Sequence, residues 1–77
     1  MPIAEGTILV VQEGRFRLLT DEGRGITFVL AHDAPLEPQD LPPLAYRRVR
    51  VAYEESPRLI AGIARDVHVL PGKGAQP

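Results

Sequence analysis

TILVVQEGRFRLLT, residues 7–20, contains two short runs of alternating apolar and polar residues that are joined only by Glu13-Gly14. A two-residue connection with glycine in its second place is typical of a tight β-hairpin, because glycine accepts the positive φ that such a turn demands. The stretch therefore predicts two antiparallel strands, residues 7–12 and 15–20, with Gln12 paired to Arg15.

This register assigns the side chains of the hairpin to two faces. Val11 is expected opposite Phe16 and Leu9 opposite Leu18, and side chains alternate between faces along each strand. Leu9, Val11, Phe16 and Leu18 are therefore predicted to form the core face. A slip by one residue would bring arginines into that face, so the apolar pattern itself determines the register.

A third strand extends the same face. The turn at residues 21–25 leads into the apolar run 26–31, which places Phe28 opposite Leu18 and Leu30 opposite Phe16. Residues 33–45 then contain four prolines, so an irregular connection is expected there, with one helical turn near residues 39–41. Its leucines are predicted to close one end of the core: Leu36, Leu41 and Leu44.

Two further strands follow the connection. Residues 47–54 alternate cleanly and place Val49, Val51 and Tyr53 inward. Residues 54–57 form a turn cluster, and the apolar run 59–70 predicts a last strand that bends or bulges at Gly62. Residues 71–77 are expected to be a flexible tail, which leaves residues 1–70 as one small domain.

The fold class that follows is all-β, a small five-stranded barrel that is closed or partly open. In a chain of 77 residues an open sheet would bury little and would leave its edges exposed. The long Pro-rich connection falls between the third and fourth strands, which favours an oligonucleotide/oligosaccharide-binding (OB) barrel. An SH3-like barrel, the alternative, usually carries its long loops earlier.

The order of the segments resembles the cold-shock domain over about residues 6–64. Gly6-Thr7-Ile8, the run 15–20 followed by Asp-Glu-Gly, and Phe28-Val29-Leu30 are similar to that family's Gly-Thr-Val strand and its two aromatic motifs, and Ser56-Pro57 stands near its Gly-Pro turn. The resemblance implies a binder of single-stranded RNA or DNA that stacks bases on exposed aromatic rings. Only Phe16 and Phe28 match stacking positions, and the register above turns both inward.

Charge is distributed unevenly, although the net charge is only −1 and the pI is near 6.1. Acidic residues are concentrated in turns and connections, whereas arginines lie mostly in or beside strands. Four arginines are predicted to point outward and to form a local basic surface suited to phosphate: Arg15, Arg17, Arg48 and Arg50. The simpler interpretation is a solvated outer face of the sheet, which guards it against edge association.

A second hypothesis concerns apolar residues on the outer face. Ile8, Val10, Leu19 and Val29 are predicted to point away from the core, and a contiguous patch of this kind tends to mark an interface. The Pro-rich connection, the last strand, a protein partner or a second copy of the chain would cover it. A protein-interaction or homodimerisation domain is therefore the alternative to a nucleic-acid binder.

The residue inventory argues against catalysis, metal binding and a cofactor. The chain has no cysteine or asparagine, one serine (Ser56) and one lysine (Lys73), so a nucleophile with a base is not expected. His32 and His68 lack a third ligand that would define a zinc site. No cysteine, no apolar run of membrane-spanning length and no charged-then-apolar leader predict a cytoplasmic protein without a membrane partner.

Overall fold

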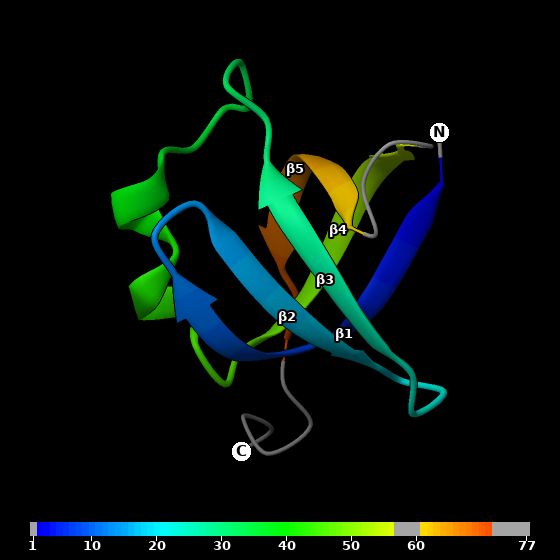
Figure 1. Ribbon diagram of the computed structural model, residues 1–77. Coiled ribbons are helices and arrows are strands. Elements are labelled where there is room, and N and C mark those ends of the chain that lie inside the picture. Colours follow the sequence, from blue (N-terminus) through cyan, green and yellow to red (C-terminus); the bar gives the residue numbers. More distant parts are fainter. Residues whose placement is uncertain (1, 57–60, 72–77) are drawn as a thin grey trace.

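In the computed structural model, five strands close into a barrel (Figure 1). The structure describes residues 2–56 and 61–71. Around the barrel the order is β1-β2-β3-β5-β4. The strands are β1 (Ile3–Gln12), β2 (Arg15–Thr20), β3 (Gly25–Leu30), β4 (Arg48–Glu55) and β5 (Gly62–Val69). Neighbours are antiparallel except β3 and β5, which run parallel. The predicted five-stranded barrel is confirmed, as is the long connection between β3 and β4.

The tight reversal between β1 and β2 lies where the sequence predicted it. Gln12 pairs with Arg15 and Val11 with Phe16. The positive φ of the turn, however, belongs to Glu13 (φ 57°) and not to Gly14. The role predicted for the glycine is therefore wrong, since the first turn residue adopts the left-handed conformation.

A β-bulge changes the faces of β1. Val10 pairs with Arg17 but Ile8 pairs with Leu18, which leaves Leu9 without an opposite residue. An inserted residue moves every preceding side chain of the strand to the opposite face of the sheet, and it bends the strand. Ile8 is consequently 0% exposed and Leu9 36% exposed. The predicted inward Leu9 and outward Ile8 are both wrong, because β1 must bend to pair with β2 along one part and with β4 along another.

β3 is shifted by two residues from the predicted register. Phe28 lies opposite Phe16, and Ile26 lies opposite Leu18. The turn closes early, because the Thr20 amide donates a hydrogen bond to the carbonyl oxygen of Arg24 (2.8 Å), so that β3 begins at Gly25. An even shift preserves parity, and Phe28 still points inward as predicted.

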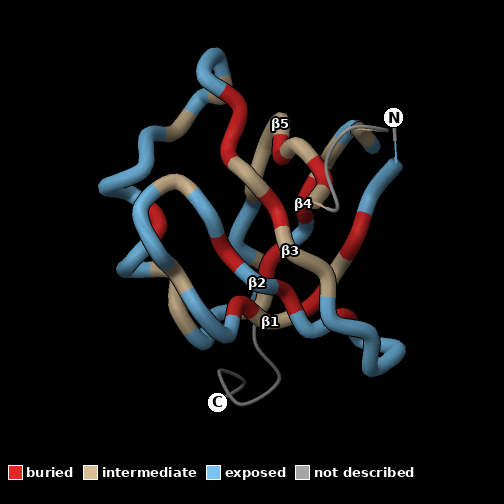
Figure 2. Tube along the Cα trace, in the orientation of Figure 1, coloured by how far each residue is buried: buried red, intermediate tan, exposed pale blue. Residues whose placement is uncertain are grey.

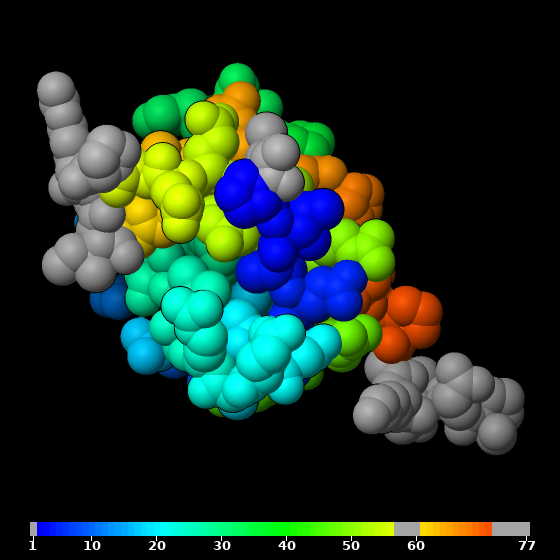
Figure 3. All heavy atoms as spheres, turned by 90° about the vertical axis from the view of Figure 1, so that its right-hand side faces the viewer, coloured from blue at the N-terminus to red at the C-terminus, as the bar shows by residue number. Residues whose placement is uncertain are grey.

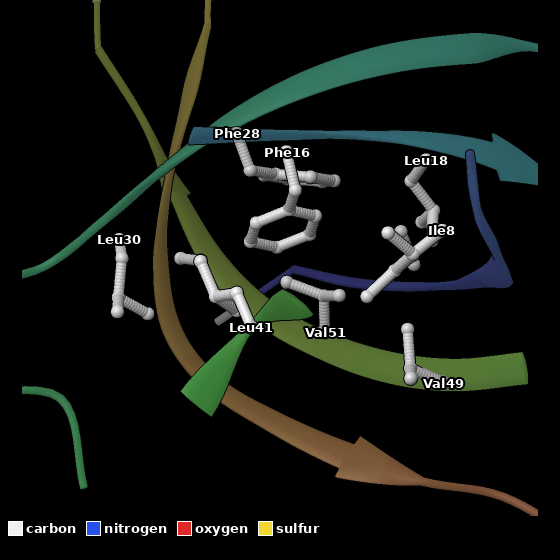
Figure 4. Packing of buried hydrophobic residues seen from close by; sticks show 10 residues of the cluster. Ile8, Phe16, Leu18, Phe28, Leu30, Leu41, Val49 and Val51 are labelled. Atoms are coloured by element: carbon white, nitrogen blue, oxygen red, sulfur yellow. The ribbon is translucent and has the colours of Figure 1, made fainter. Parts of the chain in front are cut away.

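The core fills the inside of the barrel, and Figure 4 shows side chains from β1, β2, β3, β4 and the connection converging there. The Phe16 and Phe28 ring centroids are 5.4 Å apart, and the Tyr53 ring meets Phe28 edge-on at 5.0 Å. Such pairs contribute about 0.5–1.5 kcal/mol beyond burial. The largest fully buried side chains are Phe16, Phe28, Ile8, Leu18, Leu41, Val49 and Val51.

The Pro-rich connection closes the barrel beside the β1–β2 turn (green in Figure 1). It contains two short 3₁₀ helices, η1 (Pro38–Asp40) and η2 (Pro42–Leu44), each with proline in its first turn. Figure 2 shows most of this segment exposed. Leu41 is nevertheless 0% exposed, and Leu36 and Leu44 pack against the core. The predicted closure of one end by these leucines is confirmed.

β4 has the predicted faces, since Val49 and Val51 are buried and Tyr53 packs against the core. β5 contains a second irregularity at Arg65, which has no opposite residue on β4. Gly62 is the first residue of β5. The bulge or bend predicted at Gly62 is therefore wrong in position.

Residues 57–60 and 72–77 lie outside the described residues. The predicted turn at Pro57, the first part of the run 59–70 and nearly all of the predicted tail fall there.

Candidate nucleic-acid interface

The predicted outward arginines fall into two groups, and the first is neutralised by carboxylates. Arg50 on β4 pairs with Glu5 on β1 (Nε to Oε2, 2.7 Å). Arg48 pairs with Asp21, in the β2–β3 turn, and with the other oxygen of Glu5 (3.4 Å). The β4 half of the predicted basic surface is therefore largely compensated within the barrel.

The ladder explains this cluster. Glu5 lies directly opposite Arg50 in the β1–β4 pair, and the Asp21 amide donates to the Glu5 carbonyl oxygen (2.9 Å), which holds the β2–β3 turn against β1. Figure 3 shows the three segments meeting, β1 in blue, the turn in cyan and β4 in yellow-green. The hydrogen bonds that the Arg48 guanidinium donates to the Asp21 carboxylate raise the pKa of Arg48 above its already high ordinary value. The charges of Asp21 and Glu5 raise it further, and partial desolvation opposes them. Arg48 thus stays charged and ion-paired with Asp21 and Glu5.

The second group lies on β2 and in the turn after it. Arg15 and Arg17 are exposed on the outer face of β2, as predicted, and Arg24 is exposed beside Gly25. Within residues 2–56 and 61–71 none of these three arginines forms an ion pair with a carboxylate. Arg17 donates one long hydrogen bond, to the Thr27 hydroxyl (3.5 Å). We define Arg15, Arg17 and Arg24 as the arginine row.

Two hollows flank the arginine row. One, of about 620 Å³, lies between the β1–β2 turn, the end of β3 and the connection, and Arg15 and His32 line it. The other, of about 410 Å³, lies near the opposite end of β3, and Arg17 and Arg24 line it. The row therefore extends along β2 from one concave region to the other. Sequence reasoning missed Arg24, because it lies in a turn, and only the fold of that turn brings it to the row.

The two phenylalanine rings give no stacking platform on this face, and the half-buried Tyr53 lines the hollow beside Arg17 and Arg24. Phe16 and Phe28 are 2% and 0% exposed, which agrees with their expected inward orientation. Tyr46 is the exposed ring at 77%, but it lies beside β1, where its amide donates to the Ile8 carbonyl oxygen (2.7 Å) with φ at 65°. The sequence analysis did not select Tyr46. Its exposure could have been inferred only from its position between the prolines of the connection and the arginines that follow.

The apolar outer patch keeps two of the four predicted residues, Val10 and Leu19, and gains Leu9. Val10 (54%), Leu19 (39%) and Leu9 (36%) are exposed, whereas Val29 is half-buried and Ile8 belongs to the core. Leu9 replaces Ile8 because of the bulge. We define Leu9, Val10 and Leu19 as the apolar patch.

The remaining polar side chains form surface pairs. His68 Nε2 lies 2.7 Å from Asp66 Oδ2, and Arg65 contacts Asp33 (2.9 Å) and Glu54 (3.3 Å). In the described part of the chain no three His, Cys, Asp or Glu side chains gather in a way that would hold a metal ion.

None of the helices in the described ranges has the length and apolar character needed to cross a membrane.

Comparison with known proteins identifies no relative: no protein-family model, no curated protein and no solved structure matches the chain. The candidate interface is thus defined by this chain's own geometry, namely the arginine row, which forms no ion pair with the described residues, beside the apolar patch.

Proposed function

We propose that this barrel is a non-catalytic binding module that contacts single-stranded nucleic acid, with little sequence preference, through the arginine row. The observation that carries the proposal is the separation of charge. Carboxylates pair with the arginines of β4, while Arg15 and Arg17 on β2, on the other side of β1, and Arg24 in the β2–β3 turn form no ion pair with the described residues. A guanidinium presents a planar set of donors that matches phosphate oxygens.

The architecture supports an OB-type assignment. The order β1-β2-β3-β5-β4 and the connection between β3 and β4 agree with that class, whose second and third strands form the face that binds oligonucleotides. The strand order agrees with the expected cold-shock resemblance, while the burial of Phe16 and Phe28 argues against that family's mode of stacking.

The buried rings also limit the expected affinity. Stacking on an aromatic ring contributes about 1–3 kcal/mol per base in proteins that use it, and the burial of Phe16 and Phe28 removes this contribution at both of those rings. Binding would come from phosphate contacts, so it should be modest and should weaken with salt. Three arginine contacts predict a slope of log K against log salt of about −2.

Fluorescence anisotropy of a labelled mixed-sequence oligonucleotide, measured from low to moderate salt, tests the proposal. We expect Arg15→Ala and Arg17→Ala each to weaken binding and to reduce the salt slope by about 0.7. Arg47→Ala is the matched control, because Arg47 is exposed but lies on the connection to β4. No binding at low salt, or equal losses in all three variants, would refute the proposal.

The apolar patch supports a second candidate function, self-association. The bulge places Leu9 and Val10 next to each other on the surface, and Leu19 lies on the neighbouring strand. Exposed apolar clusters of this kind mark interfaces more often than scattered residues do.

Sedimentation velocity distinguishes this candidate. A dimer that Val10→Glu or Leu19→Glu dissociates would support it, with Ile3→Glu as the control, since Ile3 is 58% exposed near the other end of β1. A monomer at high protein concentration would exclude homodimerisation.

A further inference from the structure

The hollow beside Arg17 and Arg24 lies along the first residues of β3. Within the described ranges β3 pairs with β5 only from Phe28 onward, so Gly25, Ile26 and Thr27 have no ladder partner there on that side. The volume of the hollow is about 410 Å³. The hollow is lined by Arg17, Arg24, Gly25, Ile26, Thr27, Tyr53, Glu55, Ala61 and Gly62.

The head of Arg17 is held in place by its two neighbours on β3. It donates to the Thr27 hydroxyl (3.5 Å) and lies over Gly25. A Cβ added at Gly25 would lie 2.5 Å from Nη2 and 3.1 Å from Cζ of Arg17, so the guanidinium occupies the space of the missing side chain. The φ of Gly25 lies outside the left-handed region, and therefore the backbone itself does not require glycine there.

Arg24 reaches the same hollow from a fixed turn. Its amide donates to the Thr20 hydroxyl (3.0 Å), and its carbonyl oxygen accepts from the Thr20 amide (2.8 Å). Thr20 is itself buried at 6% exposure, so the turn is anchored in the barrel. Donors that are positioned before binding lose less entropy when they bind.

The two guanidinium groups are also the charged donors of this hollow. Glu55 is the one carboxylate among its lining residues, and it forms no ion pair with either arginine in the described structure. Thr27 adds a hydroxyl, and two arginines with a hydroxyl suit a tetrahedral oxyanion better than a planar base.

We propose that Arg17 and Arg24 form a phosphate subsite that holds one phosphodiester of a bound single strand beside the first residues of β3. The inference rests on the proposed function and assigns the position of one backbone contact. A free phosphate ion presents similar oxygens, so the test uses both an oligonucleotide and inorganic phosphate.

Gly25→Ala is the most specific variant, because it displaces the Arg17 head without removing a charge. The atom it meets is the end of a flexible side chain, so we expect the fold to persist, which circular dichroism checks. Gly14→Ala is the matched control, since a Cβ there would meet only Pro38, at 3.8 Å. With a labelled oligothymidylate, we expect Gly25→Ala and Arg17→Lys to weaken binding roughly three- to tenfold and Gly14→Ala to leave it unchanged.

NMR titration locates the contact independently. Oligothymidylate should shift the Arg17 and Arg24 side-chain Nε–H signals and the Gly25 amide, and Arg17→Ala/Arg24→Ala should abolish the shift of the Gly25 amide and reduce the salt slope by about 1.4. Inorganic phosphate should produce the same shifts more weakly.

The outcomes separate this inference from the proposed function. Oligothymidylate binding that Arg15→Ala and Arg17→Ala weaken, but that is unchanged in Gly25→Ala and in Arg24→Ala, would overturn the subsite and leave the proposed function standing. Shifts with inorganic phosphate, but no binding of oligothymidylate at low salt, would overturn the phosphodiester assignment and the proposed function together.

Discussion

Gly6 shows how much a single residue position can depend on space in this small barrel. It lies in β1 between Thr20 on β2 and Val49 on β4, and it is buried. A Cβ at this position would lie 2.1 Å from the carbonyl oxygen of Leu19 and 2.6 Å from the Cα of Thr20. Both neighbours are backbone atoms, so the strands themselves would have to separate.

Gly6→Ala is therefore expected to destabilise the protein by about 1–3 kcal/mol or more, because backbone atoms cannot move aside for the added methyl group without separating the strands. Urea unfolding followed by circular dichroism measures the free energy of unfolding. Gly14→Ala, in the exposed hairpin turn, should change it by less than about 0.5 kcal/mol. Equal stability of the two variants would contradict the close approach of β1 and β2 at Gly6.

β1 is the element whose behaviour differs most from its sequence pattern. The run 8–11 is apolar throughout, so it contains no alternation that could locate an inserted residue. The bulge at Leu9 is decided by the need of β1 to follow β2 and β4 at once. As a consequence, the adjacent and chemically similar residues Ile8 and Leu9 differ in environment, Ile8 being buried and Leu9 exposed.

The contrast between Ile8 and Leu9 gives a prediction for this element. Ile8→Ala should cost about 2–5 kcal/mol, since Ile8 is fully buried in the core. Leu9→Ala should cost less than about 1 kcal/mol, because its side chain is partly in solvent. Chemical denaturation of both variants measures the difference, and a larger loss for Leu9 would indicate the regular ladder without a bulge.

At the scale of the whole molecule, ion pairing separates the surface into two regions. Glu5 and Asp21 engage Arg48 and Arg50 on the β4 side of β1, whereas Arg15 and Arg17 on β2 form no ion pair with the described residues. Net charge hides this separation, since the chain as a whole is at −1.

Glu5→Gln should therefore strengthen oligonucleotide binding. It releases Arg50, while Arg48 keeps Asp21, and it adds one cation to the surface available to phosphates. We expect the salt slope to steepen by about 0.7 in the anisotropy experiment. Glu13→Gln makes the same change of net charge in the hairpin turn and should have the smaller effect. A stronger gain from Glu13→Gln would place the contact at the hairpin end of β2.

The sequence by itself determined the hairpin, the number of strands and most of the inward face, including Phe16, Leu18, Phe28 and Val51. These features depend on neighbours along one strand or across a short turn, where side-chain alternation carries the information. Only the tertiary structure decided the bulge at Leu9, the burial of Ile8 and the pairing of Arg50 with Glu5, 45 residues away. Closing the barrel brings β1 and β4 together, and that closure decides which arginines stay available.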